Sequence, residues 1–291
     1  MEQHLLHPLD RAFVRSIHRG SVPLSWYLSA NWGDALSPII TSWLSGKPVV
    51  HIEGLHHDRF LVIGSILGCA NERAEVWGAG FIREGETAHG RPRAVHAVRG
   101  PLSRAALISQ GIECPEIYGD PALLLPRMWN PGVVKTHAVG IIPHYVDKAH
   151  PWLDQYRADP RVIVIDIEQG ITGFVNQVKS CEVILSSSLH GLICADAYGI
   201  PNAWVRLSDA VIGGDFKFRD YRLSIGADEP KALCLTSGVS LAGAVACAES
   251  RTVDLNLDAL IDVCPFISQK MRQQLLPHRS ASDEHRSASL R

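Results

Sequence analysis

The chain has 291 residues, of which 46% are hydrophobic and 20% are charged, and its formal net charge is -2. This composition is typical of a globular protein, and the lack of a long basic run argues against a nucleic-acid binder. No apolar run is long enough to cross a bilayer, and residues 1–15 lack the apolar core of a signal peptide. We therefore expect a cytoplasmic protein that has no nucleic-acid partner.

Short apolar runs alternate with helical patterns in the first half of the chain. Strands are expected at Val22–Leu28, Phe60–Ile66, Val76–Gly80 and Ala94–Val98, and helices at Asp34–Leu44 and Pro101–Gln110. Pro101 suits the first turn of its helix, and Gly111 suits the position after the last turn.

The second half repeats this alternation. Strands are expected at Ala138–Ile142, Val162–Ile167, Glu182–Leu185 and Ala203–Leu207, and helices at Trp152–Arg157, Ile171–Lys179 and Leu189–Tyr198. The β-branched run Val162–Ile167 is typical of a strand buried on both faces. Alternation of this kind indicates parallel sheets with helices on both faces.

The fold class predicted from this order is α/β, with two domains at residues 1–130 and 131–275. Between them, Leu125–Thr136 contains the prolines and the glycine that are typical of a linker. Residues 276–291 are rich in Ser, Arg and His and have no periodicity, so we expect a disordered tail.

The seven cysteines are odd in number and form no CxxC pair. Several lie in apolar runs, which favours reduced, buried thiols over disulfides or a zinc site. The spacing of His51, His56 and His57 fits no standard metal site. Neither a metal nor a cofactor is therefore expected.

Residues 186–191, with the sequence Ser-Ser-Ser-Leu-His-Gly, join a predicted buried strand to a helix. A helix N-terminus offers free backbone N–H groups and a positive partial charge, which suits an anion. His190 would project from the first turn at the sheet edge where open α/β sheets bind ligands, and Gly191 would let a ligand approach. The alternative is that the serines only cap the helix and His190 packs on a neighbour.

Arg99 follows another predicted strand and stands just before a helix. Two interpretations fit this position. The guanidinium can fork onto a carboxylate or phosphate of a ligand, or it can form a salt bridge with a carboxylate such as Asp120. The sequence leaves both open.

Two turns complete the candidate site. Asn31, Gly33 and Asp34 open the first strand–turn–helix unit, where they can cap the helix or contact a ligand. Gly78 and Gly80 form a glycine pair after a strand, which weakly resembles a phosphate loop.

Residues 213–220 combine two glycines with aromatic and charged side chains, among them Lys217 and Arg219. Loops of this composition often close over ligands. The alternative is a surface loop anchored by Phe216 and Phe218.

Taken together, these segments resemble the polysaccharide pyruvyl transferase family, and its exopolysaccharide ketal-pyruvate branch in particular. Four stretches follow the family's order, namely residues 31–37, 98–101, 118–121 and 186–192, the last of which continues to residue 201. Each motif is weak alone, but the ordered set is specific and spans roughly residues 28–221.

The resemblance implies a fold like the GT-B glycosyltransferases, with two Rossmann-like domains facing a cleft. It implies phosphoenolpyruvate as donor and a polysaccharide or lipid-linked oligosaccharide as acceptor, and a lipid-linked acceptor would bring the protein to the inner membrane. His190 and Arg99 match the family's catalytic and donor-site positions. The expected substrate-binding residues are Asn31, Gly33, Asp34, Gly78, Gly80, Asp120, Ser187, Ser188, Gly191, Lys217 and Arg219.

The implied chemistry explains these residue types. Phosphoenolpyruvate carries a carboxylate and a phosphate, so its pocket needs cations and oriented N–H groups. Ketal formation begins with protonation of the methylene carbon, which suits a histidine because imidazole titrates near neutral pH. We expect His190 to be the general acid/base, Arg99 to hold the donor, and Ser187 and Ser188 to receive phosphate.

Two alternatives remain. A nucleotide-sugar glycosyltransferase of GT-B architecture would also place anion-binding helix ends beside the cleft, with an acidic residue near Asp196 holding a ribose. A non-catalytic glycan-binding subunit of a polysaccharide assembly complex would use Arg99 and His190 for binding alone.

Overall fold

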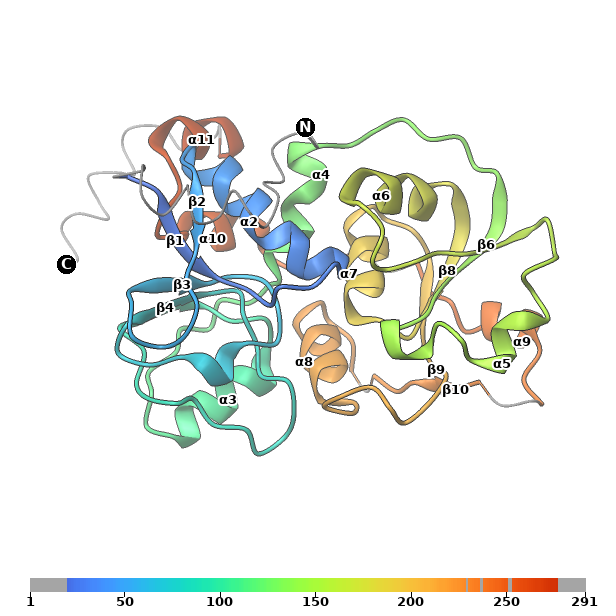
Figure 1. Cartoon of the computed structure of the whole chain (residues 1–291), viewed down its shortest axis with the longest axis horizontal. Helices are drawn as coiled ribbons and strands as arrows, with labels where there is room; N and C mark the ends of the chain where they lie inside the picture. Colours follow the sequence, from blue (N-terminus) through green and yellow to red (C-terminus); the bar gives the residue numbers. More distant parts are fainter. Residues whose placement is uncertain (1–19, 229, 236–237, 251–252, 277–291) are drawn as a thin grey trace.

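The computed structural model describes residues 20–228, 230–235, 238–250 and 253–276. These residues form two parallel five-stranded sheets with helices packed around them (Figure 1). The predicted α/β class is therefore confirmed. The segment 1–15 and all of the predicted tail except the buried Leu276 lie outside the described residues.

The first sheet has the strand order β2-β1-β3-β4-β5 and is parallel throughout. Its strands are β1 (Val22–Ser25), β2 (Val49–His51), β3 (Arg59–Leu61), β4 (Ala74–Trp77) and β5 (Ala94–Ala97). Most are shorter than predicted, because the apolar runs continue past the last ladder hydrogen bonds into the loops that follow. Strand β2 was not predicted, since three half-buried residues give no readable alternation.

Helices and short helical turns connect these strands. They are α2 (Trp32–Ser45), η2 (Leu67–Cys69), α3 (Pro101–Ser109), η3 (Pro121–Leu124) and α4 (Leu125–Met128). The side chain of Asn31 caps α2 by accepting from the Gly33 N–H, and Gly46 ends the helix in the left-handed conformation. The predicted linker therefore starts with a helical turn, and its remainder runs across to the second sheet.

The second sheet has the order β10-β9-β8-β6-β7 and is also parallel. Its strands are β6 (His137–Ile142), β7 (Val162–Val164), β8 (Cys181–Ser186), β9 (Asn202–Arg206) and β10 (Leu233–Cys234). The prediction that the 162–167 run is buried on both faces is wrong, because β7 lies at the sheet edge and is only half-buried. Its β-branched composition reflects strand propensity and not central position.

The helical elements of this half are η4 (Tyr145–Asp147), α5 (Pro151–Asp154), α6 (Ile171–Lys179), α7 (Leu189–Ala197), α8 (Phe216–Ser224) and α9 (Leu241–Val245). The prediction of a loop at residues 213–220 holds for residues 213–215 and is wrong for the rest, because α8 begins at Phe216. Its sequence has weak helical periodicity, and tertiary contacts fix it instead: Phe218 stacks on Trp204, with ring centroids 4.8 Å apart.

The last two helices, α10 (Leu257–Asp262) and α11 (Gln269–Leu275), return to the first half of the chain. The indole of Trp77 donates to the carbonyl of Leu260 at 2.9 Å, and the ring of Phe266 packs edge-on against Trp77. Figure 1 shows both helices beside β1 and α2. The proposed second domain at 131–275 therefore ends in a segment that packs on the first sheet, which the linear alternation of elements did not indicate.

The two halves are joined by backbone and side-chain contacts. The Trp32 N–H donates to the Ile167 carbonyl at 2.9 Å, and the Trp32 ring packs on Phe174. Helix α8 lies between the halves in Figure 1 and packs against α3 of the first half. One continuous cluster of buried apolar side chains runs through both halves, so they share a core.

All seven cysteines carry free thiols. Cys114, Cys181, Cys194 and Cys264 are buried as predicted, whereas Cys69, Cys234 and Cys247 are exposed. Within the described part of the chain, no helix has both the length and the apolar character needed to cross a membrane.

Candidate active site

Residues that follow the carboxyl ends of β1 and β8 meet at the junction between the halves. His190, in the first turn of α7, comes from the second half and meets Gly33 of the first half. A Cβ atom at Gly33 would overlap the imidazole ring, so the ring lies directly against the start of α2. This contact explains a glycine inside a helix, where alanine is otherwise preferred by about 1 kcal/mol.

His190 and Asp120 form the centre of the site. Nε2 of His190 lies 3.7 Å from Oδ2 of Asp120, and both side chains are buried. Neither atom has a hydrogen-bond partner among the described residues, whereas the other oxygen of Asp120 caps η3 by accepting from the Ala122 N–H. Buried polar atoms are almost always hydrogen-bonded, so an exception calls for an explanation such as a catalytic role, a bound ligand or a bound water.

Asp34 adds a second carboxylate to this group. Its Oδ2 accepts a hydrogen bond of 2.7 Å from the Ser29 hydroxyl. Burial raises the pKa of Asp34 above its usual range, and the nearby charges of His190 and Lys217 act against that rise. Asp34 is therefore within electrostatic reach of both side chains.

The N-terminus of α7 supplies backbone N–H groups beside His190. Ser188 is the N-cap residue, yet its hydroxyl caps no backbone group of the helix. The Ser186 hydroxyl donates to the Ser188 carbonyl, and the Ser187 hydroxyl accepts from the His144 N–H at 2.9 Å. Simple capping of α7 by its serines is therefore not what the structure shows, and the helix end remains suited to an anion.

Lys217, on α8, is the strongest cation candidate. Its side chain is buried but forms no ion pair or hydrogen bond with the described residues, and its Nζ lies 5.5 Å from the centre of the Phe218 ring. Burial lowers the pKa of Lys217 to about 8, with the charge of Arg99 acting in the same direction and that of Asp34 against it. A buried ammonium without an ion-pair partner is costly, and an anionic ligand would lower that cost.

His144 joins the site from the loop after β6. Its backbone N–H donates to Ser187, and its ring is buried. Burial, together with the charges of Lys217 and His190, lowers the pKa of His144 to about 4. The ring is therefore neutral near pH 7, and the positive charge of the site is concentrated elsewhere.

Arg99 is fully buried and already paired. Its Nε and Nη2 reach Oδ2 of Asp220 on α8, at 3.1 and 2.9 Å, and Nη2 also donates to the Phe81 carbonyl at 2.6 Å. The suggested salt bridge with Asp120 is wrong, because Asp120 faces His190 instead. Arg99 thus fastens the helix that carries Lys217 to the first half.

Three predicted glycines make room for protein groups. A Cβ at Gly78 would overlap Pro121, one at Gly80 would overlap the Arg99 guanidinium, and one at Gly191 would approach the Ser186 hydroxyl. The surroundings of these glycines are therefore unlike those of a phosphate-binding loop. The side chain of Asn31 likewise serves as the α2 cap.

Arg219 is not brought into this group. Its side chain is exposed, and it lies two residues after Lys217 on α8. Residues two apart on a helix do not share a face. The helical conformation that buries Lys217 therefore turns Arg219 away.

The sequence did not single out His144 or Asp147 in the site region. It also did not indicate that Asp220 would pair with Arg99. His144 follows a strand at the carboxyl edge, which was a usable signal. Asp220 sits 121 positions from Arg99, and no local pattern could have paired them.

Alanine at Gly33 is expected to displace the His190 ring and lower turnover about 100-fold, because small misplacements of catalytic groups carry costs of that order. Steady-state kinetics with circular dichroism as a folding check would measure this. Gly132 is exposed with no atom near its would-be Cβ, so alanine there is the matched control and should leave turnover unchanged. Equal activity of both variants would contradict the placement of the ring.

Comparison with known proteins identifies the family. The model of the polysaccharide pyruvyl transferase family matches residues 77–209. An uncharacterized protein of Acanthamoeba polyphaga mimivirus is 31% identical over 231 residues, covering 75% of this chain and 79% of the relative. The chain belongs to the polysaccharide pyruvyl transferase family.

A solved structure of an uncharacterized protein from Klebsiella pneumoniae is also similar, with a TM-score of 0.43 and 11% identity. The similarity covers 78% of this chain and 97% of the Klebsiella chain. The region that matches the polysaccharide pyruvyl transferase model includes Arg99, Asp120 and His190, whereas Gly33 and Lys217 lie outside it.

Asp196, near which a nucleotide-sugar enzyme was expected to hold the ribose, is engaged in other contacts. It is buried and accepts hydrogen bonds from Tyr221, Arg222 and Asn202. These contacts tie α7 to α8 and β9. The structure therefore gives no support to a ribose contact at this position.

Proposed function

We propose that the protein transfers pyruvate from phosphoenolpyruvate to two hydroxyls of a sugar, forming a ketal in exopolysaccharide biosynthesis. The observation that carries the proposal is the buried pair of unpartnered atoms, His190 Nε2 and Asp120 Oδ2, beside the uncompensated ammonium of Lys217. A proton-transfer group next to an anion site is what this reaction requires.

Donor binding uses the groups that lack partners. Lys217 attracts the anionic donor, and the N–H groups at the start of α7, with the Ser188 hydroxyl, receive its phosphate. Arg99 contributes its charge from behind this site and holds α8 in place through Asp220. We therefore assign Arg99 a positioning role and not a direct contact with the donor in this conformation.

The transfer begins with a proton. Protonated His190 gives its proton to the methylene carbon of the donor, and the adjacent carbon becomes cation-like. One sugar hydroxyl adds to that carbon and returns a proton to His190, with Asp120 stabilising the imidazolium. The bond from that carbon to the phosphate oxygen then breaks. The second hydroxyl closes the ring, and its proton leaves with the phosphate.

Product analysis tests this function. Purified protein is incubated with phosphoenolpyruvate and a panel of oligosaccharides, and inorganic phosphate and the new methyl resonance of a ketal are followed. We expect phosphate release that depends on the saccharide and matches ketal formation. Binding without release would favour a glycan-binding subunit, and transfer from a nucleotide-sugar would favour a glycosyltransferase.

Donor affinity is expected to depend on the charge of Lys217. The pKa of Lys217 is lowered to about 8, so the ammonium is present below that pH and is lost above it. The dissociation constant for phosphoenolpyruvate should therefore rise as the pH passes about 8. Isothermal titration calorimetry between pH 7 and pH 9.5 measures this, and Lys217→Arg, whose charge persists to higher pH, should remove the rise. An identical rise in both proteins would contradict the assignment.

A further inference from the structure

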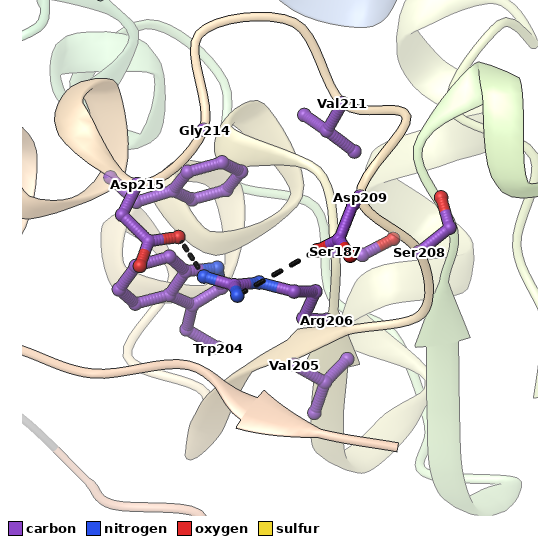
Figure 2. Close-up of a pocket in the computed structure, with 10 residues that line it drawn as sticks. Ser187, Trp204, Val205, Arg206, Ser208, Asp209, Val211, Gly214 and Asp215 are labelled. Carbon is purple, nitrogen blue, oxygen red and sulfur yellow. Dashed lines mark hydrogen bonds and ion pairs between the residues drawn. The ribbon is translucent and has the colours of Figure 1, made fainter. Parts of the chain in front are cut away.

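A separate cavity of about 360 Å³ opens beside the proposed donor site, at the carboxyl end of β9 (Figure 2). Its volume falls within the range of ligand pockets, about 300–1,000 Å³. Ser187 lines it on one side and Phe218, which follows Lys217, on another. The cavity and the donor site therefore share α8 and the loop after β8, and Ser187 lies at the boundary between them.

The polar lining consists of paired donors and acceptors. Arg206 forms ion pairs with Asp215 and, at 3.8 Å, with Asp209, whose side chain is 95% exposed. Figure 2 shows the guanidinium between these two carboxylates. Neighbouring groups of this kind suit the adjacent hydroxyls of a sugar, since each hydroxyl both donates and accepts a hydrogen bond.

The apolar part of the lining suits the C–H surface of a pyranose ring. Trp204 and Phe218 both line the cavity and stack with their planes 10° apart. Val211, from the loop after β9, also lines the cavity (Figure 2). Pockets for small molecules combine such apolar walls with a few polar groups.

The charge of the cavity argues against an anionic ligand. Its lining holds two carboxylates and one guanidinium, and a third carboxylate, Asp147, accepts hydrogen bonds from the lining residues Ser187 and Ser208. The donor site next to it carries the uncompensated Lys217. A diphosphate or a second anion would be repelled here, whereas a neutral polyol would not.

We propose that this cavity binds the acceptor as a neutral saccharide unit, with Arg206, Asp209 and Asp215 as its hydroxyl-binding groups. This rests on the proposed function, because the adjoining donor site defines the ligand as an acceptor. The saccharide would sit at the Ser187 side of the donor, with its hydroxyl pair directed toward the start of α7.

The test measures saccharide binding apart from turnover. Saturation-transfer difference NMR is recorded on the His190→Gln protein with phosphoenolpyruvate present, using the methyl glycosides of glucose, galactose and mannose. Glucuronic acid and UDP-glucose serve as charged comparisons. The variants are Val211→Trp, which fills the cavity, Asp209→Asn, which removes an exposed carboxylate, and Ile212→Trp. Ile212 is in the same loop and 55% exposed, and it does not line the cavity, so it is the matched control.

We expect at least one neutral glycoside to bind, with binding lost in Val211→Trp, about 10-fold weaker in Asp209→Asn and unchanged in Ile212→Trp. Donor-induced thermal stabilisation should be the same in all of these proteins. Glycoside binding that survives Val211→Trp, or preferential binding of the charged compounds, would overturn the proposal. Donor stabilisation without any glycoside binding would overturn the saccharide site alone, whereas missing donor stabilisation would overturn the proposed function.

Discussion

Glutamine in place of His190 is expected to lower turnover about 100- to 10,000-fold, the range that a general acid/base contributes. The glutamine amide fills most of the space against Gly33 but cannot deliver a proton to carbon. Because His190 is not an assigned donor ligand, thermal stabilisation by phosphoenolpyruvate should persist. Initial rates of phosphate release, together with donor titrations followed by melting temperature, measure both effects.

Two further variants sharpen this result. Asp120→Asn keeps the cap of η3 but removes the charge that faces His190, so its loss of turnover should be smaller. His89 is exposed, so His89→Gln should be as active as the wild-type protein. Turnover in His190→Gln within about 10-fold of wild type would remove His190 from the acid/base role.

Alanine in place of Arg99 is expected to lower the free energy of unfolding by about 3–5 kcal/mol, because it leaves the buried carboxylate of Asp220 without its counterion. The same change should also weaken donor binding, since Arg99 holds the helix that carries Lys217. Urea denaturation followed by circular dichroism, alongside donor titrations, measures the two effects.

Matched variants distinguish the effect of losing the buried Arg99–Asp220 ion pair from the general effect of removing an arginine. Arg73 pairs with Asp58 at the surface, where both side chains are about half exposed, so Arg73→Ala should cost less than about 1 kcal/mol. In the double variant Arg99→Met with Asp220→Asn, no buried charge is left unpaired, and part of the lost stability should return. Unchanged stability of Arg99→Ala with complete loss of donor binding would instead favour direct donor contact by Arg99.

Much of the fold was predictable because the helices and strands obey local rules. Helix α6 matches its predicted range, Ile171–Lys179, since four buried residues repeat at helical spacing and glycine precedes it. Helix α8 was taken for a loop because its burial is decided by Trp204 and by Arg99, both distant in sequence. The return of α10 to the first half depends on contacts such as that of Trp77 with Leu260, which no local pattern encodes.

The candidate site was predictable in its residue types but not in its pairings. His190 and Asp34 each follow a strand at the carboxyl edge of a parallel sheet. This position was enough to assign both to one site, and in the structure their charges interact. The sequence could not show that Asp120 faces His190, that Asp220 occupies Arg99, or that Lys217 is left without a counterion. These outcomes depend on how the two halves dock.

The most direct test of the proposed donor site is thermal unfolding with phosphoenolpyruvate and, separately, with a panel of nucleotide-sugars. The proteins compared are wild type, Lys217→Met, which should fold because it removes an uncompensated buried charge, and Lys47→Met, an exposed-lysine control. A ligand that binds the folded state raises the melting temperature with its concentration. The proposed site predicts such a rise with phosphoenolpyruvate alone, present in wild type and Lys47→Met and absent in Lys217→Met. A rise with a nucleotide-sugar alone, or one that persists in Lys217→Met, would contradict it.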